Sequence, residues 1–183
     1  MPPKQRITRE MILEKSFEMF CREGMDVVNA RSVAKALNCS TQPIFSYFSG
    51  MDDLKNALDE KARVLFEQRI EAGLREEEAL VSAGCAYVRF AAEQPHLFTH
   101  LTARANPLEL FAGKEQREAL IDREAAHTGL AREQAETLCR RMFMYIHGAA
   151  AICACDSAAF SIEELEQMIR DAHGMNVAFF SGR

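Results

Sequence analysis

The spacing of apolar residues predicts a chain built of helices throughout. Apolar positions recur every three or four residues, which is the period of a helix that buries one side. This pattern predicts helices over residues 8–24, 29–38, 40–48, 51–72, 76–94, 96–101, 114–127, 132–155 and 161–174, the last being broken at Gly174. Residues 103–113 read as a looser segment, and residues 2–6 as a short basic arm. Because no strand-like alternation is found, we expect an all-α fold.

The first short helix has clear signals at both ends. Asn29 is a good N-cap, since its side-chain oxygen can accept an N–H of the first turn. Asn38 suits the end of the helix, because asparagine tolerates the left-handed conformation better than most residues. The expected buried positions between these ends are Val33, Ala34 and Leu37.

A second short helix follows at once. Ser40 is the expected N-cap, and Pro43 is tolerated because it falls in the first turn, where an N–H has no partner within the helix. Ile44 and Phe48, four residues apart, form its buried side. Two short helices joined by a tight turn match the helix-turn-helix pattern, in which the second helix enters the DNA major groove.

The flanking residues make this match more specific. Residues 7–55 resemble the N-terminal DNA-binding domain of the TetR family of transcriptional regulators (TetR/AcrR type). In that family a helix ends in glycine and a pattern "T…IA…GVS…LYYHF…K…L" follows. The corresponding positions here are Gly24, Asn29, Val33-Ala34, Asn38-Cys39-Ser40, Ile44-Phe45, Tyr47-Phe48 and Leu54. Asn38 replaces the usual turn glycine, and Met51 stands where the family usually has a phosphate-contacting lysine.

The resemblance implies an organisation for the whole chain. Residues 1–50 would form the helix-turn-helix DNA-binding domain, and residues 51–183 a helical bundle for ligand binding and dimerisation. The expected function is a homodimeric repressor that a small-molecule effector releases from DNA, with no enzymatic activity and no cofactor. The two C-terminal helices would form the dimer interface. Its operator would be near-palindromic, with half-sites about 34 Å apart.

Nine residues are expected to contact DNA. Thr41, Gln42 and Ser46 are candidates for base edges, because glutamine pairs well with adenine in the major groove. Phe45 would lie against a thymine methyl group or the sugar backbone, and Pro43 either contacts DNA or only starts the helix. The candidates for phosphate contacts that fix the register are Arg31, Ser40, Tyr47 and Lys55.

Aromatic and methionine residues of the C-terminal part have two interpretations. They form either a plain hydrophobic core or the lining of an apolar cavity between helices. The resemblance favours a cavity, with Arg104 or His147 as its polar point. The candidate lining residues are Phe66, Tyr87, Phe90, Arg104, Phe111, Phe143, Met144 and His147.

The charge of −5 is unevenly distributed. Residues 1–55 contain eight Lys and Arg against seven Asp and Glu, and so carry +1; the remaining residues carry −6. A near-neutral head on an acidic body fits a protein that touches DNA at one end only. The near-neutral head and Met51 also keep an alternative open: a helical protein that binds a small molecule or a protein partner without reading DNA.

Other chemistry finds little support in the sequence. There is no glycine-rich phosphate loop, no spaced metal-binding motif and no Ser- or Cys-based nucleophile arrangement. A small helical enzyme is therefore the third interpretation, after the DNA-binding regulator and the helical binding protein that does not read DNA. His96 and His100 have the spacing of a two-histidine metal pair but lack a clear third ligand. The six cysteines suggest reduced structural thiols, with redox sensing as the alternative. No apolar run reaches the ~20 residues of a membrane span, so we expect a cytoplasmic protein.

Overall fold

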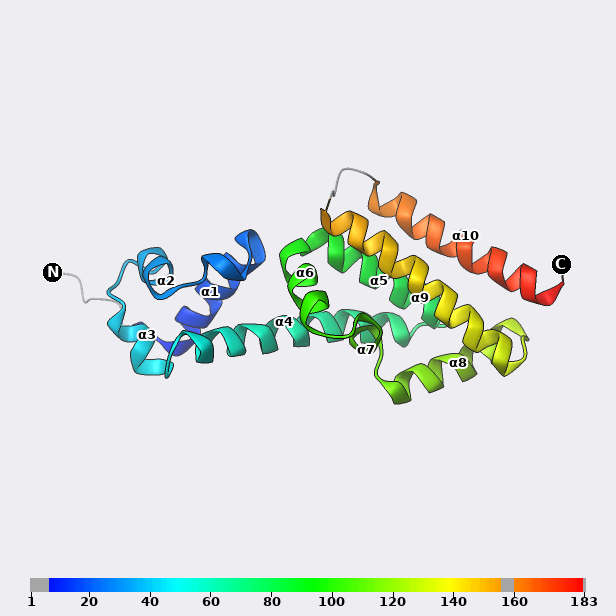
Figure 1. Ribbon diagram of the computed structural model, residues 1–183, viewed down its shortest axis with the longest axis horizontal. Helices are drawn as coiled ribbons and strands as arrows, with labels where there is room; N and C mark the ends of the chain where they lie inside the picture. The colour runs from blue at the N-terminus through cyan, green and yellow to red at the C-terminus, as the bar shows by residue number, and fades with distance from the viewer. Residues whose placement is uncertain (1–6, 156–159, 183) are drawn as a thin grey trace. The chain divides into compact units, whose positions relative to one another are not determined.

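The fold is all-α, as predicted. The computed structural model describes residues 7–155 and 160–182, and in these ranges it contains ten α-helices, one 3-10 helix and no strand (Figure 1). The predicted arm at residues 2–6 and most of the turn before residue 161 lie outside the described ranges. The helices are α1 (Arg9–Glu23), η1 (Met25–Val27), α2 (Ala30–Ala36), α3 (Gln42–Tyr47), α4 (Met51–Leu74), α5 (Ala79–Glu93), α6 (Pro95–Arg104), α7 (Pro107–Phe111), α8 (Lys114–Thr128), α9 (Arg132–Cys155) and α10 (Ile162–Ser181).

The chain divides into two compact units, Met1–Val64 and Leu65–Arg183, which we call the head and the body. The division falls inside α4, so this helix contributes its first half to the head and its second half to the body. A functional boundary at residue 50 stays a prediction.

The head is a small core built from one side of each of its helices. Thr8 caps α1, because its Oγ1 accepts the N–H of Met11 at 3.2 Å. The spacing of Leu13, Phe17 and Phe20 predicts them on the buried side of α1. Phe20 is buried, but Phe17 is half-buried, and the Lys61 ammonium lies 4.7 Å from the centre of its ring. The buried apolar residues of the head are Ile12, Phe20, Val28, Val33, Ala34, Ile44, Phe48, Leu54, Leu58 and Ala62.

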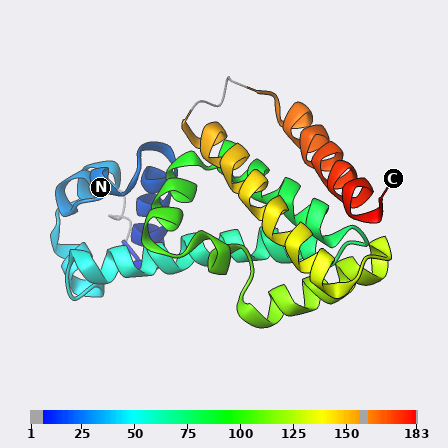
Figure 2. The same ribbon diagram turned by 45° about the vertical axis from the view of Figure 1, so that its right-hand side comes forward.

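The body is a bundle with α5 at its centre. This helix buries residues on all sides, as expected for a helix enclosed by others. Helices α9 and α10 pack on it, and α8 packs on α9, in both views (Figures 1 and 2). Gln134 Nε2 donates to the carbonyl of Phe180 at 3.3 Å and Arg141 Nη1 to Asn176 Oδ1 at 3.4 Å, so α9 and α10 run antiparallel.

Two helix starts differ from the sequence prediction. The triplet at residues 76–78 forms a turn rather than the first turn of α5, and Arg123 of α8 holds that turn by donating to the carbonyls of Leu74 and Glu76. The segment predicted to be loose contains α7, which Asn106 caps by accepting the N–H of Leu108 at 3.0 Å. The pair Asn106-Pro107 therefore begins a helix instead of only interrupting one.

The last two helices also depart from the prediction. α10 continues through Gly174, because a glycine in a helix costs only about 1 kcal/mol and does not force a break. The helical spacing of Leu138, Met142, Tyr145 and Ile152 predicts a single apolar face. α9 buries the first two of these residues but exposes the other two. The helix therefore has two apolar faces, of which the monomer buries one.

Candidate functional site

The first helix of the helix-turn-helix begins and ends as the sequence predicts. Asn29 Oδ1 accepts the N–H groups of Arg31 and Ser32 at 3.2 and 3.0 Å, and the N–H of Asn29 donates to Ser32 Oγ at 3.1 Å, which completes a capping box. At the other end Asn38 has φ 52°, the left-handed conformation expected of it. These local signals fix the turn that leads into α3.

The start of α3 corrects one prediction. Ser40 is not its N-cap; the helix begins at Gln42, and Thr41 occupies the cap position without a side-chain hydrogen bond. Pro43 lies in the first turn as expected, where its missing N–H removes no hydrogen bond within the helix.

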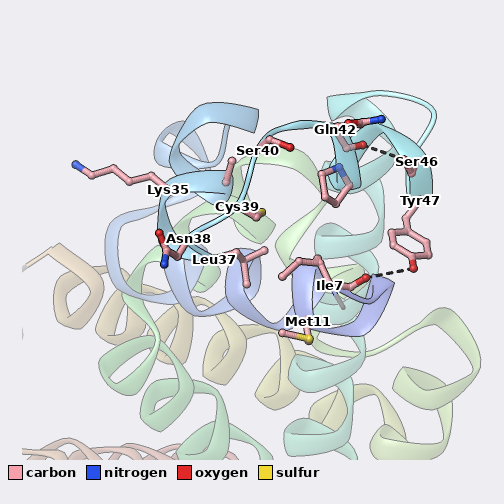
Figure 3. A pocket seen from close by; sticks show the side chains of 12 residues that line it. Ile7, Met11, Lys35, Leu37, Asn38, Cys39, Ser40, Gln42, Ser46 and Tyr47 are labelled. Carbon is pink, nitrogen blue, oxygen red and sulfur yellow. Dashed lines mark hydrogen bonds between the residues drawn. The ribbon is translucent and has the colours of Figure 1, made fainter. Parts of the chain in front are cut away.

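Helix α3 has a buried apolar side and an exposed, mostly polar side. Ile44 and Phe48 are 0% and 1% exposed and hold the helix against the head. Gln42 and Ser46 lie one turn apart on the outside, and Ser46 Oγ donates to the carbonyl of Gln42 at 3.0 Å (Figure 3). Phe45 is 53% exposed and also lies on the outer side of α3.

The remaining predicted DNA contacts surround this face. Arg31, at the beginning of α2, and Ser40, in the turn, are exposed. Lys55, in the first turns of α4, is half-buried, as are Thr41 and Pro43. The structure therefore leaves the predicted set at least partly accessible in the head.

Tyr47 has a structural partner that the sequence did not reveal. Its hydroxyl donates to the carbonyl of Ile7 at 3.2 Å and so ties the end of α3 to the segment before α1 (Figure 3). A phenol has a single O–H proton, so it cannot donate to this carbonyl and to a phosphate at the same time.

This contact gives a testable prediction for Tyr47→Phe. We expect the free energy of unfolding of the protein to fall by about 0.5–1 kcal/mol, because an exposed hydrogen bond is lost, while affinity for DNA changes little. Urea unfolding and a DNA-binding titration measure the two quantities. Unchanged stability with a marked loss of DNA affinity would instead assign the hydroxyl to a phosphate.

A broad groove of about 1110 Å³ runs beside α3. Its lining comes from the start of α1, the end of α2, the turn and α3, with the half-buried side chains of Ile7, Met11 and Leu37 among its walls (Figure 3). Lys35 and Asn38 also line the groove and are exposed. The helical spacing of α2 places Lys35 on its polar side, but the pattern of one helix does not reveal which other helix lies beside it.

The predicted pocket residues of the body form an aromatic cluster around Tyr87. This side chain is fully buried, and its hydroxyl lies 2.9 Å from Nδ1 of His147. Burial raises the pKa of Tyr87 above its usual value, so the hydroxyl that is hydrogen-bonded to His147 stays neutral. Rings at 5.0–6.5 Å centroid distances connect Phe66, Tyr87, Phe90, Phe98, Phe111, Phe143 and His147.

Two predicted pocket residues lie apart from this cluster. Arg104 is exposed at the end of α6, and Met144 is 70% exposed on α9. Phe143 precedes Met144 and stacks on His147 with ring centroids 5.8 Å apart and planes 15° apart. Neighbouring residues of α9 thus face the core and the surface.

The cysteines differ in accessibility. Burial raises the pKa of the Cys139 thiol to about 12 and that of Cys21, Cys85 and Cys153 above the usual value. Cys155 at the end of α9 is exposed. A raised pKa leaves less thiolate at a given pH, and the thiolate is the reactive form.

We therefore expect iodoacetamide at pH 8 to alkylate Cys155 first and Cys139 among the slowest. Peptide mass spectrometry at successive times measures the order. Urea-unfolded protein, in which all six thiols should react at similar rates, is the control. Equal rates in the folded protein would contradict the burial described.

Across residues 7–155 and 160–182, no three His, Cys, Asp or Glu side chains gather as a metal site would require. None of the helices in those ranges combines the length and apolar character needed to cross a bilayer.

Comparison with known proteins points to one class. No protein-family profile matches the sequence. A curated relative, the uncharacterized HTH-type transcriptional regulator YobS of Bacillus subtilis (strain 168), is 23% identical over 168 residues, covering 90% of this chain and 87% of that protein. Among solved structures, a transcriptional regulator of Rhodococcus sp. Rha1 aligns with a TM-score of 0.67 at 18% identity and covers 93% and 96% of the two chains.

Two further structures agree. A TetR-like transcriptional regulator from Rhodococcus sp. RHA1 aligns with a TM-score of 0.65 at 14% identity, over 94% of this chain and 99% of that one. A TetR variant from Acinetobacter baumannii AYE, solved in complex with minocycline, aligns with a TM-score of 0.57 at 16% identity, over 96% and 97%.

The class is therefore that of helix-turn-helix proteins with a helical C-terminal part. The chain has the TetR-like fold, which confirms the resemblance predicted from residues 7–55. The proteins with which it aligns are transcriptional regulators, a non-enzymatic class.

Proposed function

We propose that this protein is a sequence-specific, DNA-binding transcriptional regulator that reads DNA with α3. The observation that carries the proposal is the contrast within α3, where buried Ile44 and Phe48 anchor a face on which Gln42, Phe45 and Ser46 are exposed. A helix held this rigidly can present side chains to base edges in the major groove. With such a DNA partner, we expect the protein to act in the cytoplasm.

Dimerisation is the second part of the proposal. Helices α9 and α10 expose large apolar residues that the monomer does not cover: Tyr145, Ile152, Met168, Met175 and Phe179 are 37–68% exposed. Two antiparallel helices with such a surface can pair with the same helices of a second copy as a four-helix interface. A two-fold dimer would place two α3 helices on the half-sites of a near-palindromic operator.

The third part is control by a small molecule, which would make the protein a ligand-released repressor. The aromatic cluster around Tyr87 joins α4, α5, α6, α7 and α9, so a change in its packing affects several helices at once. The effector would lower DNA affinity only by the difference in its own affinity for the DNA-competent state and the alternative state.

The reading role of α3 is tested by Gln42→Ala. We expect specific operator binding to weaken by roughly 1–3 kcal/mol, because a paired hydrogen bond to a base is lost, while binding to scrambled DNA stays nearly unchanged. Fluorescence anisotropy with both duplexes measures the difference. Gln68→Ala on α4, which also removes an exposed helical glutamine, serves as the control. Equal losses of affinity on both duplexes would mean that Gln42 supports the fold of the head and does not contact a base.

A further inference from the structure

A second groove lies in the body beside the buried aromatic cluster. Phe111 and Phe143 belong to both. The groove has a volume of about 480 Å³ and lies among α5, α7, α8 and α9, whose packing is visible in Figure 2. Its size falls within the range of small-molecule sites, about 300–1,000 Å³. The apolar lining consists of Leu80, Leu108, Phe111, Leu120, Ile121, Cys139, Phe143 and Met144.

Four charged side chains also line this groove: Arg117, Glu118, Glu136 and Arg140. All but Arg117 form ion pairs among the described residues. Glu136 accepts from Arg140 at 2.8 Å, and Glu118 pairs with Arg132, which also binds Asp122 at 2.8 Å. Arg117 is half-buried and donates from Nη1 to the carbonyl of Ala112 at 2.7 Å. Within residues 7–155 and 160–182 it has no ion pair with a carboxylate.

The setting of Arg117 favours an anionic partner. A guanidinium has five N–H donors, and the bond to Ala112 uses one of them while fixing the side chain beside the end of α7. Unlike Arg140, which pairs with Glu136, it forms no ion pair with a carboxylate among the described residues. A carboxylate matches the fork of the remaining donors, and such charge-assisted pairs are stronger than neutral hydrogen bonds.

We propose that the groove binds an amphipathic monocarboxylate, with the carboxylate on Arg117 and the apolar part along the walls. The apolar part would contact Phe111 and Phe143, each less than 10% exposed, and the half-buried Leu108. A cationic ligand is disfavoured because the two nearby glutamates are already paired. A neutral apolar molecule would leave the guanidinium without an ionic partner.

The groove is connected to the parts of the protein that regulation would use. Phe111 and Phe143 form its wall and also pack on Tyr87, at centroid distances of 5.5 and 6.5 Å. α9, which carries Phe143, also carries Tyr145 of the proposed dimer surface. Any effect of the ligand on DNA rests on the proposed function, whereas binding of the carboxylate does not.

The experiment uses the full chain labelled with ¹³C at the methionine methyl groups. Octanoate is titrated in NMR spectra, with 1-octanol and octylamine as neutral and cationic probes of the same chain length. We expect octanoate to shift the Met144 methyl signal, assigned with Met144→Leu, and to bind about tenfold or more tightly than 1-octanol, because the ionic pair is absent for the alcohol. The methyl signal of Met11 in the head serves as the internal reference.

Two variants separate the pairing from the general packing. Arg117→Gln should reduce octanoate affinity about tenfold to the level of the alcohol and leave 1-octanol binding unchanged. Arg140→Gln, at the same groove but on a guanidinium already paired with Glu136, should keep the preference for octanoate. Equal affinity for octanoate and 1-octanol, or octanoate binding unaffected by Arg117→Gln, would overturn the proposal. Since none of these readouts involves DNA, their outcome is independent of operator binding.

Discussion

Replacing Phe179 by glutamate is expected to convert the protein from a dimer into a monomer of 20.6 kDa and to reduce operator affinity about 100-fold or more. The ring is 67% exposed on α10. In an apolar helix interface, the desolvation free energy of two carboxylates would exceed any stabilisation that they gain there. The affinity falls because two linked half-site contacts are replaced by one. Light scattering after size-exclusion chromatography measures the mass, and anisotropy the affinity.

The monomer itself should tolerate this change. The Arg141 guanidinium lies 5.2 Å from the centre of the Phe179 ring, so a glutamate at this position gains a cationic neighbour. Val64→Glu, which puts the same charge on an exposed apolar position of α4, is the control and should leave the mass unchanged. A Phe179→Glu protein that remains dimeric would rule out α10 as the interface.

Gly73→Ala is expected to lower the free energy of unfolding of the body by about 3 kcal/mol. An added Cβ at Gly73, near the end of α4, would lie 2.6 Å from both N and Cα of Ala83 in α5. These neighbours are backbone atoms, so one helix must move away from the other and loosen the packing around it. Urea unfolding monitored by circular dichroism measures the effect.

The matched control is Gly174→Ala, in the middle of α10. An added Cβ there meets nothing within 4 Å, so we expect a gain of about 0.5–1 kcal/mol from the better helix propensity of alanine. Equal changes in the free energy of unfolding for the two substitutions would contradict the close approach of α4 and α5 at Gly73.

The sequence was most informative where local chemistry decides the structure. The cap at Asn29, the left-handed Asn38 and the buried Ile44 and Phe48 all follow from one or two turns of chain, and all are present. Such signals need no knowledge of distant residues. They also carry the candidate DNA-contacting face, since its position relative to the buried side is a property of α3 alone.

Tertiary contacts set the limits of prediction. Nothing near Glu76 in the sequence indicates that Arg123 holds its carbonyl, and nothing near Tyr47 indicates Ile7 as a partner. The two apolar faces of α9 could not be separated, because periodicity shows that a residue is apolar but not which neighbour covers it. For the same reason the groove at Arg117 is visible only once α7, α8 and α9 are assembled.

The most direct test of the central claim is selection of DNA from a random duplex library, with the purified protein at near-physiological salt. We predict enrichment of a near-palindrome whose half-sites are centred about one helical turn, or 34 Å, apart. The selected duplex should bind at least about 1,000-fold more tightly than scrambled DNA. If folded, dimeric protein enriches no sequence, α3 does not read DNA, and the chain is instead a helical binding protein that uses the fold without its usual partner.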